Sequence, residues 1–310
     1  MNRIINSYTE KKSGPLLIVL GAMHGNESAG VEAIKAVFEL INDEPDNNSN
    51  FCFHGKIVGI IGNLKAYQKG VRFIDKDINR HLLNHHVERI FGLPEERLDA
   101  EDKEIKEILT LIQEQVKLYN PDKLYILDIH TTSAQGGIFT IPNDTLESVQ
   151  VALDIHAPVV QGMLDGIKGT TLHFFKSENM GINTTAVTFE AGEHYDPISI
   201  KNATSALINC LRAIGCVERR NIEEKHNNWL YQMSKDLPTK TKLIFRQPVD
   251  KDDDFEMMPN FKNFQLVEAG TLLAKNKYGE IRAKETSRVL MPLYQPQGED
   301  GFFLIKDLFD

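Results

Sequence analysis

The stretch Leu16–Glu27, LLIVLGAMHGNE, decides the fold. Its first part, Leu16–Leu20, is a short apolar run, which is typical of a β-strand buried on both faces. A glycine-containing loop follows, and Ser28–Ile41 then places apolar residues at helical spacing. A buried strand that leads through a loop into an amphipathic helix predicts an α/β fold.

The same alternation continues over the first 220 residues. Further strands are predicted at Lys56–Gly62, Leu124–Ile129 and Thr184–Phe189, and helices at Ala100–Tyr119 and Ile198–Ile214. Strands separated by helices favour a largely parallel sheet with helices on both faces. We therefore expect a mixed, largely parallel α/β sheet flanked by helices.

The pattern changes after residue 220. Residues 221–228 are charged and rich in asparagine, which predicts a linker. From residue 229 to residue 310, short β-like runs are separated by Gly, Pro and Asn turns, which is typical of a small, mostly antiparallel β domain. We expect two domains, a catalytic domain over 1–220 and a C-terminal β domain over 229–310.

Composition narrows the function classes. The chain has 35 Lys+Arg against 44 Asp+Glu, so a nucleic-acid partner is not expected. No apolar run approaches the ~20 residues of a membrane span, and the polar opening lacks the apolar core of a signal peptide, so no membrane partner is expected. The cysteines Cys52, Cys210 and Cys216 are odd in number and lack metal-ligand spacing. That favours a reducing, cytoplasmic setting. The oligomeric state stays open, a homo-oligomer included.

Two residues of the opening loop could bind a metal. His24 and Glu27 are three apart, so on one helical turn both side chains can converge on one point, and they supply two of the three protein ligands of a His₂Glu zinc site. The alternative is a glycine-rich turn in which His24 is merely polar. His130 ends the apolar strand Leu124–Ile129 and could be the third ligand. A close pair plus one distant ligand suits a catalytic zinc, although His130 could also be a hydrogen-bonded histidine at a strand end.

Two further segments carry charges suited to catalysis. The loop Asn63–Arg80 holds Arg72 and Arg80, and a guanidinium group can bind a carboxylate or stabilise an oxyanion. Glu190 ends the strand Thr184–Phe189 and is a candidate general base for a zinc-bound water. The alternatives are a solvated charged loop and a surface carboxylate.

Four motifs in this order resemble the succinylglutamate desuccinylase/aspartoacylase family, which is related to the zinc carboxypeptidases. They are GAMHGNE (Gly21–Glu27), RFIDKDINR (Arg72–Arg80), DIHTTS (Asp128–Ser133) and TFEAG (Thr188–Gly192). The segment MPLYQPQGEDGFF (Met291–Phe303) also resembles the end of the family's β domain. The resemblance implies a zinc carboxypeptidase-like fold.

The resemblance also implies a metal centre. It assigns one Zn²⁺ per chain to His24, Glu27 and His130. It further implies that Asp77 lies where zinc carboxypeptidases place a carboxylate that orients the first zinc histidine, and such a hydrogen bond fixes the imidazole tautomer.

The remaining motif residues receive roles in binding and catalysis by the same resemblance. Arg72 matches the residue that polarises the scissile carbonyl, and Asn79 with Arg80 matches the pair that holds the substrate's α-carboxylate. Glu190 matches the base that activates water and then protonates the leaving amine.

The chain departs from the aspartoacylases at one point. Those enzymes carry a further arginine about ten residues before the catalytic glutamate, whereas Phe175–Asn183 here contains Lys176 and no arginine. The acyl group and the amino acid are therefore left open, as is the role of Tyr294.

We expect a zinc-dependent hydrolase that removes an acyl group from an N-acyl amino acid or a similar small carboxylate. The alternatives are a zinc carboxypeptidase acting on peptide C-termini and a non-catalytic binding protein on the same scaffold. His81, His85 and His86 could form a second metal site, but a solvated helix is the favoured interpretation. His194 could contact the pocket, and Asp128 could support His130 or cap a strand end.

Overall fold

The structure is a computed structural model that describes residues 1–10, 13–143, 145–218 and 225–308. Its strands are β1 (Ile4–Tyr8), β2 (Leu16–Gly21), β3 (Lys56–Ile61), β4 (Leu124–Thr132), β5 (Phe139–Pro142), β6 (Val159–Gln161), β7 (Thr184–Glu193), β8 (Lys240–Pro248), β9 (Glu256–Met257), β10 (Leu266–Val267), β11 (Leu272–Asn276), β12 (Gly279–Arg282), β13 (Ser287–Leu290) and β14 (Asp300–Asp307).

The helices are α1 (Ala29–Asn47), α2 (Leu64–Lys69), α3 (Asn84–Gly92), α4 (Ala100–Tyr119), α5 (Leu146–Asp154), α6 (Met163–Gly166), α7 (Thr171–Phe174), α8 (Ser177–Met180), α9 (Ile198–Ala213) and α10 (Lys225–Ser234), with 3₁₀ turns at Ile78–Arg80 and Glu95–Arg97. In the described part of the chain, no helix combines the length and apolar character required to cross a membrane.

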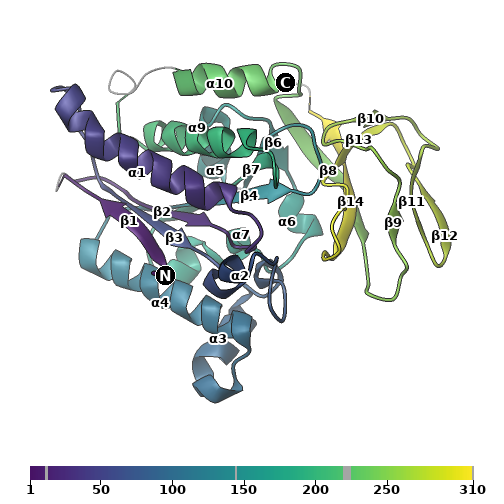
Figure 1. Cartoon of the computed structure of the whole chain (residues 1–310), viewed down its shortest axis with the longest axis horizontal. Helices are drawn as coiled ribbons and strands as arrows, with labels where there is room; N and C mark the ends of the chain where they lie inside the picture. The colour runs from purple at the N-terminus through teal and green to yellow at the C-terminus, as the bar shows by residue number, and fades with distance from the viewer. Residues whose placement is uncertain (11–12, 144, 219–224, 309–310) are drawn as a thin grey trace.

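One sheet runs through most of the molecule. Within the described residues it has eleven strands in the order β1-β3-β2-β4-β7-β5-β6-β8-β14-β13-β10. The strands β3, β2, β4 and β7 are parallel, whereas β1 and β5 run antiparallel to β3 and β7. The expected mixed, largely parallel α/β sheet flanked by helices is confirmed, with antiparallel strands towards the C-terminus (Figure 1).

The C-terminal strands continue this sheet rather than forming a wholly separate one. β8 pairs in parallel with β6, and β14 pairs antiparallel with β8. A smaller sheet, β12-β11-β9, lies beyond them (Figure 1). The division into domains 1–220 and 229–310 stays a prediction. Of the predicted linker, residues 221–224 lie outside the described residues, and 225–228 begin helix α10.

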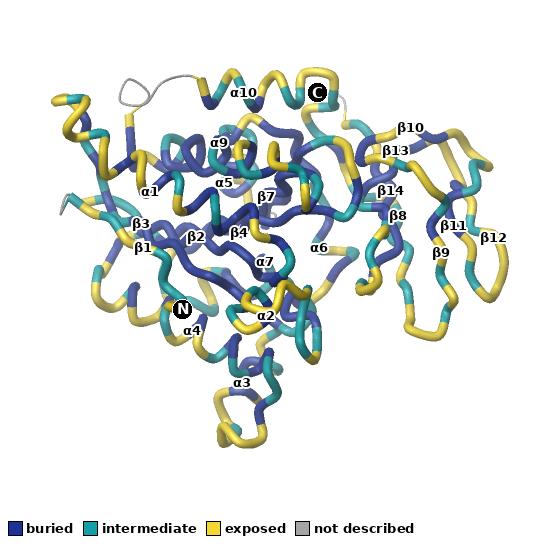
Figure 2. Tube along the Cα trace, in the orientation of Figure 1, coloured by how far each residue is buried: buried dark blue, intermediate teal, exposed yellow. Residues whose placement is uncertain are grey.

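Alternate residues of the central strands bury against opposite helical layers. Leu17 and Val19 of β2 belong to the apolar cluster that includes α1 and α9. Leu16 and Ile18 belong to the cluster that includes α3 and α4. Figure 1 shows α1 and α9 on one side of the sheet and α3 and α4 on the other. The period-two alternation along each strand therefore creates two cores, and the central strands are buried throughout (Figure 2).

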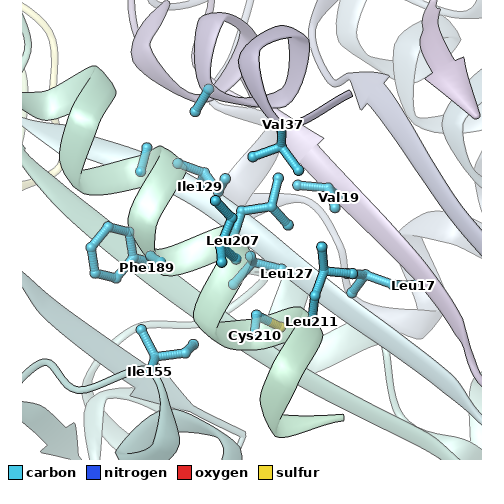
Figure 3. Close-up of a cluster of buried hydrophobic side chains, with 14 of the residues drawn as sticks. Leu17, Val19, Val37, Leu127, Ile129, Ile155, Phe189, Leu207, Cys210 and Leu211 are labelled. Carbon is cyan, nitrogen blue, oxygen red and sulfur yellow. The ribbon is translucent and has the colours of Figure 1, made fainter. Parts of the chain in front are cut away.

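The layer under α9 shows how closely the helices contact the sheet. In Figure 3, Leu207 and Leu211 of α9 lie over Leu127 of β4, with Leu17 from β2 beside them. All four side chains are fully buried. Such interdigitated aliphatic contacts fix the position of the strands relative to the helices, and the polar residues described below project from these strands.

Some elements lacked a clear sequence signal. Helix α1 extends beyond the predicted Ser28–Ile41 to Asn47, because its last turns are polar and exposed and so show no apolar periodicity. Edge strand β1 is only half-buried and mixes polar with apolar residues. Strands β5 and β6 are too short for a periodic pattern. Burial, rather than local propensity, makes them strands.

Replacing Leu207 by alanine should destabilise the fold by about 2–5 kcal/mol, since it removes three carbons from a closed apolar layer. Leu118→Ala is the matched control, because Leu118 also lies in a long helix but is 77% exposed, and its effect should be about 0.5 kcal/mol or less. Urea unfolding followed by circular dichroism measures both. Equal losses of stability in the two variants would contradict this account of the core.

Candidate active site

The site lies at the carboxyl ends of the central parallel strands, where ligands bind in open α/β sheets. The register pairs His130 of β4 with Glu190 of β7, and Asp128 of β4 with Thr188 of β7. Residues two apart in a strand face the same side, so all four side chains project from one face of the sheet. Strand pairing alone thus brings together two predicted site residues that are far apart in the sequence.

His24 and Glu27 converge through a turn. Helix α1 begins only at Ala29, so the two residues precede it, and the predicted helical spacing is not how they meet. Instead the Glu27 amide donates to the His24 carbonyl at 3.0 Å, and Ala22 before the turn takes a positive φ of 56°. Gly25 is required here, because a Cβ atom would lie 2.2 Å from the carbonyl carbon of Ala66.

The Glu27 carboxylate bridges the two histidines. Its Oε1 lies 2.8 Å from His24 Nδ1, and its Oε2 lies 3.0 Å from His130 Nδ1. All three side chains are buried, and their ligand atoms lie within 4.8 Å of one another, close enough to share one metal ion. The structure therefore brings together the three residues predicted as metal ligands.

Each histidine is held from its far side by a second carboxylate. His24 Nε2 lies 3.0 Å from Asp77 Oδ1, and His130 Nε2 lies 2.9 Å from Asp128 Oδ2. When both Nε2 atoms donate to these carboxylates, both Nδ1 atoms present lone pairs towards Glu27. Two imidazole nitrogens and a carboxylate with this orientation fit a divalent metal such as zinc.

The buried charges are strongly coupled. Burial opposes ionisation of Glu27, yet His24 and His130 hold the pKa of its carboxyl well below the usual range. Asp77 is affected in the same way by His24 and Arg72, which lower its pKa against the effect of burial. Asp128 and Glu27 raise the pKa of His130, again against burial. This centre therefore favours positive charge between its carboxylates, whether as protons or as a metal ion.

Arg72 lies beside the same cluster. Its Nη2 donates to Asp77 Oδ2 at 3.0 Å, and its Nη1 lies 3.4 Å from Glu27 Oε1. The Gly25 amide donates to the Arg72 carbonyl at 3.0 Å, so a backbone hydrogen bond joins the loop Asn63–Arg80 to the turn that holds His24 and Glu27. The guanidinium group is thereby placed at the edge of the candidate metal centre.

Asn79 and Arg80 lie in the 3₁₀ turn Ile78–Arg80, which the Asp77 side chain caps by accepting from the Asn79 amide. Asn79 Nδ2 lies 3.1 Å from His130 Nε2. Arg80 donates through Nη1 to the Asn79 carbonyl at 2.7 Å and through Nη2 to Asp300 of β14, while its buried Nε makes no hydrogen bond and lies 3.8 Å from Glu299 Oε2. These acids support the positive charge, and the pKa of Arg80 is raised although burial opposes it.

Glu190 is the unusual carboxylate of the site. It is buried, and its Oε2 makes no hydrogen bond. Burial, assisted by the nearby charges of Glu27 and Asp128, raises the pKa of Glu190 to about 8. A group of this kind can exchange a proton near neutral pH, whereas a bound cation nearby would lower the value again.

These residues share one cavity of about 120 Å³. The predicted residues that line it are His24, Glu27, Arg72, Asn79, Arg80, His130 and Glu190. Asp77 reaches the cavity only through its contacts with His24 and Arg72. The C-terminal segment closes part of the wall with Leu293, Gln295 and Asp300 among others.

Sequence reasoning missed two contributors. Thr171 at the start of α7 donates from its hydroxyl to Asp128 and from its amide to Asn79 Oδ1, the latter at 3.2 Å. Asp300 reaches Arg80 from the C-terminal strand β14. Nothing local marks Thr171, because a single threonine gains its role only when distant segments meet. The QGEDG stretch around Asp300 was the one signal available.

His85, His86, His194 and Tyr294 lie outside the candidate metal centre. His85 and His86 lie on α3 with their rings close together, and they form no metal-sized cluster in the part of the chain that the structure describes. His194 bonds Thr131 at 2.7 Å and Gln295 at 3.2 Å, next to the cavity. Tyr294 points elsewhere, since its hydroxyl donates to the Met258 carbonyl at 2.7 Å.

Solved structures share this fold. A succinylglutamate desuccinylase/aspartoacylase from Rhodobacter sphaeroides superposes with a TM-score of 0.63 at 16% identity, covering 96% of this chain and 87% of that one. At this level of identity the likeness concerns the fold alone.

Sequence comparison extends the likeness. A succinylglutamate desuccinylase from Pseudoalteromonas atlantica is 21% identical over 295 residues, which is 91% of this chain and 77% of that protein. A probable aspartoacylase from Nostoc sp. is 27% identical over 125 residues, which is 40% of this chain and only 37% of that protein. The model of the succinylglutamate desuccinylase/aspartoacylase catalytic domain matches residues 13–214, a span that holds every residue of the His24–Glu27–His130 centre together with Glu190. The chain therefore belongs to the succinylglutamate desuccinylase/aspartoacylase family.

Proposed function

We propose that this deacylase-family protein is a zinc-dependent hydrolase that removes an acyl group from an N-acyl amino acid or a similar small carboxylate. The observation that carries the proposal is the strand register that pairs His130 with Glu190 at the cavity. It sets a candidate metal ligand and an unpartnered carboxylate on one face of the sheet. Hydrolysis of an amide with a metal requires this combination.

The metal would be held by His24 Nδ1, His130 Nδ1 and the Glu27 carboxylate. A zinc ion bound there supplies a Lewis acid that makes water a nucleophile near neutral pH. When Asp77 and Asp128 each accept from the Nε2 of one histidine, they keep the two imidazoles oriented with Nδ1 towards the metal. Three protein ligands leave a coordination position open for water.

Glu190 is the proposed proton carrier. Its unpartnered, buried Oε2 can accept the proton of the attacking water and then pass it to the leaving amine. Arg72 faces the reacting carbonyl and stabilises negative charge on its oxygen. Arg80 and Asn79, which both line the cavity, hold the substrate's α-carboxylate.

A zinc carboxypeptidase is the first alternative, and it would use the same residues. The wall contributed by Leu293, Gln295 and Asp300 supports a small substrate over a long peptide, because it narrows the cavity from the C-terminal side. A non-catalytic binding protein is the second alternative. The presence of the complete ligand set together with Glu190 supports an enzyme.

We also propose a cytoplasmic location. Cys210 and Cys216 are buried free thiols, and burial raises the pKa of Cys210 to about 12. Thiols that stay protonated and unpaired suit a reducing compartment.

Zinc content tests the metal centre. The purified protein should bind one zinc ion per chain, and His24→Ala should lose most of it, because two protein ligands hold zinc far more weakly than three. His85→Ala, on the exposed side of α3, is the matched control and should keep its zinc. Elemental analysis after dialysis measures all three proteins. Equal zinc in His24→Ala and the wild type would refute the assignment.

Glu190→Gln should separate zinc binding from catalysis. The amide cannot take up the proton, so turnover of N-acyl amino acids should fall by ~10²–10⁴-fold. Zinc content and the unfolding temperature should stay close to those of the wild type, since Glu190 is not among the proposed ligands. Steady-state kinetics with amine detection gives the rate. A loss of only a few-fold would place the base elsewhere.

Replacing Arg72 and replacing Arg80 should change different kinetic constants. Arg80→Ala should chiefly raise KM, because its contact to the carboxylate exists in both ground and transition states, whereas Arg72→Ala should chiefly lower kcat. Amidating the substrate's α-carboxylate should cost the wild type much of its kcat/KM but cost Arg80→Ala little more. Simple addition of the two losses would show that Arg80 does not hold the carboxylate.

A further inference from the structure

We propose that the substrate is an N-acyl amino acid whose α-carboxylate is its only charged group, and that apolar groups fill the rest of the cavity. The proposal rests on the function proposed above and names its substrate class. It follows from the distribution of charge and apolar surface around the cavity, taken residue by residue.

The cavity offers few positive groups. Among the described residues that line it, the permanent cations are Arg72 and Arg80. Arg72 is committed to Asp77 and the edge of the metal centre. Arg80 donates through Nη1 to the Asn79 carbonyl and through Nη2 to Asp300, and the remaining N–H groups of its guanidinium can hold one carboxylate. Lys176, the basic residue of the segment before Glu190, is not part of the lining as the structure describes it.

Acidic side chains occupy the side of the cavity next to Arg80. Asp300 bonds Arg80 through one oxygen and Arg246 through the other, and Glu299 lies 3.8 Å from Arg80. Both acids line the cavity, whereas Arg246 is not part of the lining. A second carboxylate on the substrate would meet negative charge here, with no lining cation left to pair with it.

The other wall is apolar and continuous with the core. Met163, Ile167, Leu172, Ile141 and Phe303 line the cavity and also belong to the buried cluster that includes α3 and α4. Leu164 also lines the cavity but is only partly buried, so a longer side chain can be accommodated at this position. A carboxylate against such a wall would lose its hydration without gaining a partner, while an aliphatic group would gain by burial.

Substrates of similar length, with and without a second carboxylate, test the proposed substrate class at the amino-acid side chain and at the acyl group. For the amino acid, the zinc-loaded enzyme is assayed with N-acetyl-L-methionine, N-acetyl-L-glutamine and N-acetyl-L-glutamate. For the acyl group, N-butanoyl-L-methionine is compared with N-succinyl-L-methionine. In each series the uncharged apolar compound should have a kcat/KM at least about tenfold above the carboxylate, with glutamine between.

Binding provides a readout that does not depend on turnover. Titration calorimetry with zinc-loaded Glu190→Gln should show tighter binding of N-acetyl-L-methionine than of N-acetyl-L-glutamate, again by about tenfold or more. This result would support the substrate class even if chemistry were slow.

A single charge added to the apolar wall should change the preference. Leu164→Lys and Leu164→Met place side chains of similar length at one position, with and without an ammonium group. Relative to Leu164→Met, Leu164→Lys should lower the ratio of kcat/KM for N-acetyl-L-methionine to that for N-acetyl-L-glutamate by about tenfold. The reason is that the added ammonium group can pair with the side-chain carboxylate of the glutamate substrate. A ratio equal to that of Leu164→Met would overturn the placement of the substrate against this wall.

The two proposals fail separately. If the dicarboxylates are hydrolysed and bound as well as or better than their uncharged counterparts, the substrate class is wrong while the deacylase function stands. If no N-acyl amino acid in either series is hydrolysed by the zinc-loaded wild type, the proposed function is overturned and this inference falls with it.

Discussion

The candidate site depends on one buried carboxylate. Glu27 is 1% exposed and lies within bonding distance of His24, His130 and the Thr131 amide. A carboxylate removed from water is costly unless it is paired and hydrogen-bonded, so the loop after β2 and the end of β4 must come together around it. Arg72, from the loop Asn63–Arg80, also approaches this carboxylate, with its Nη1 at 3.4 Å from Glu27 Oε1.

Charge alternates outward from that centre. Asp77, His24, Glu27, His130 and Asp128 follow one another as acid, imidazole, acid, imidazole, acid, each within 3.0 Å of the next. A buried polar network is stable only when its members are satisfied, and here a cation between the imidazoles and Glu27 would satisfy it best. The same negative surroundings explain why Glu190, lying near but without a partner of its own, is hard to ionise.

The C-terminal third of the chain is part of this arrangement. β8 extends the sheet by pairing with β6, and β14 then brings Asp300 to Arg80. The four family motifs hold the candidate metal ligands and Glu190, whereas the C-terminal segment and α6 line another part of the cavity. The candidate metal centre and the remaining cavity wall thus come from different parts of the fold.

The sequence by itself determined the α/β class and the four central strands, because buried strands appear as short apolar runs. It also identified His24, Glu27, His130 and Glu190 as candidates for chemistry, because they stand in motifs that follow these strands. It did not reveal strands β1, β5 and β6, whose identity depends on burial by distant segments. Nor could it show that His24 and Glu27 meet in a turn, or that Thr171 and Asp300 join the site. Those contacts arise only when the β4–β7 register and the β6–β8 junction bring remote segments together, and pairings at such separations leave no periodic pattern in a single sequence.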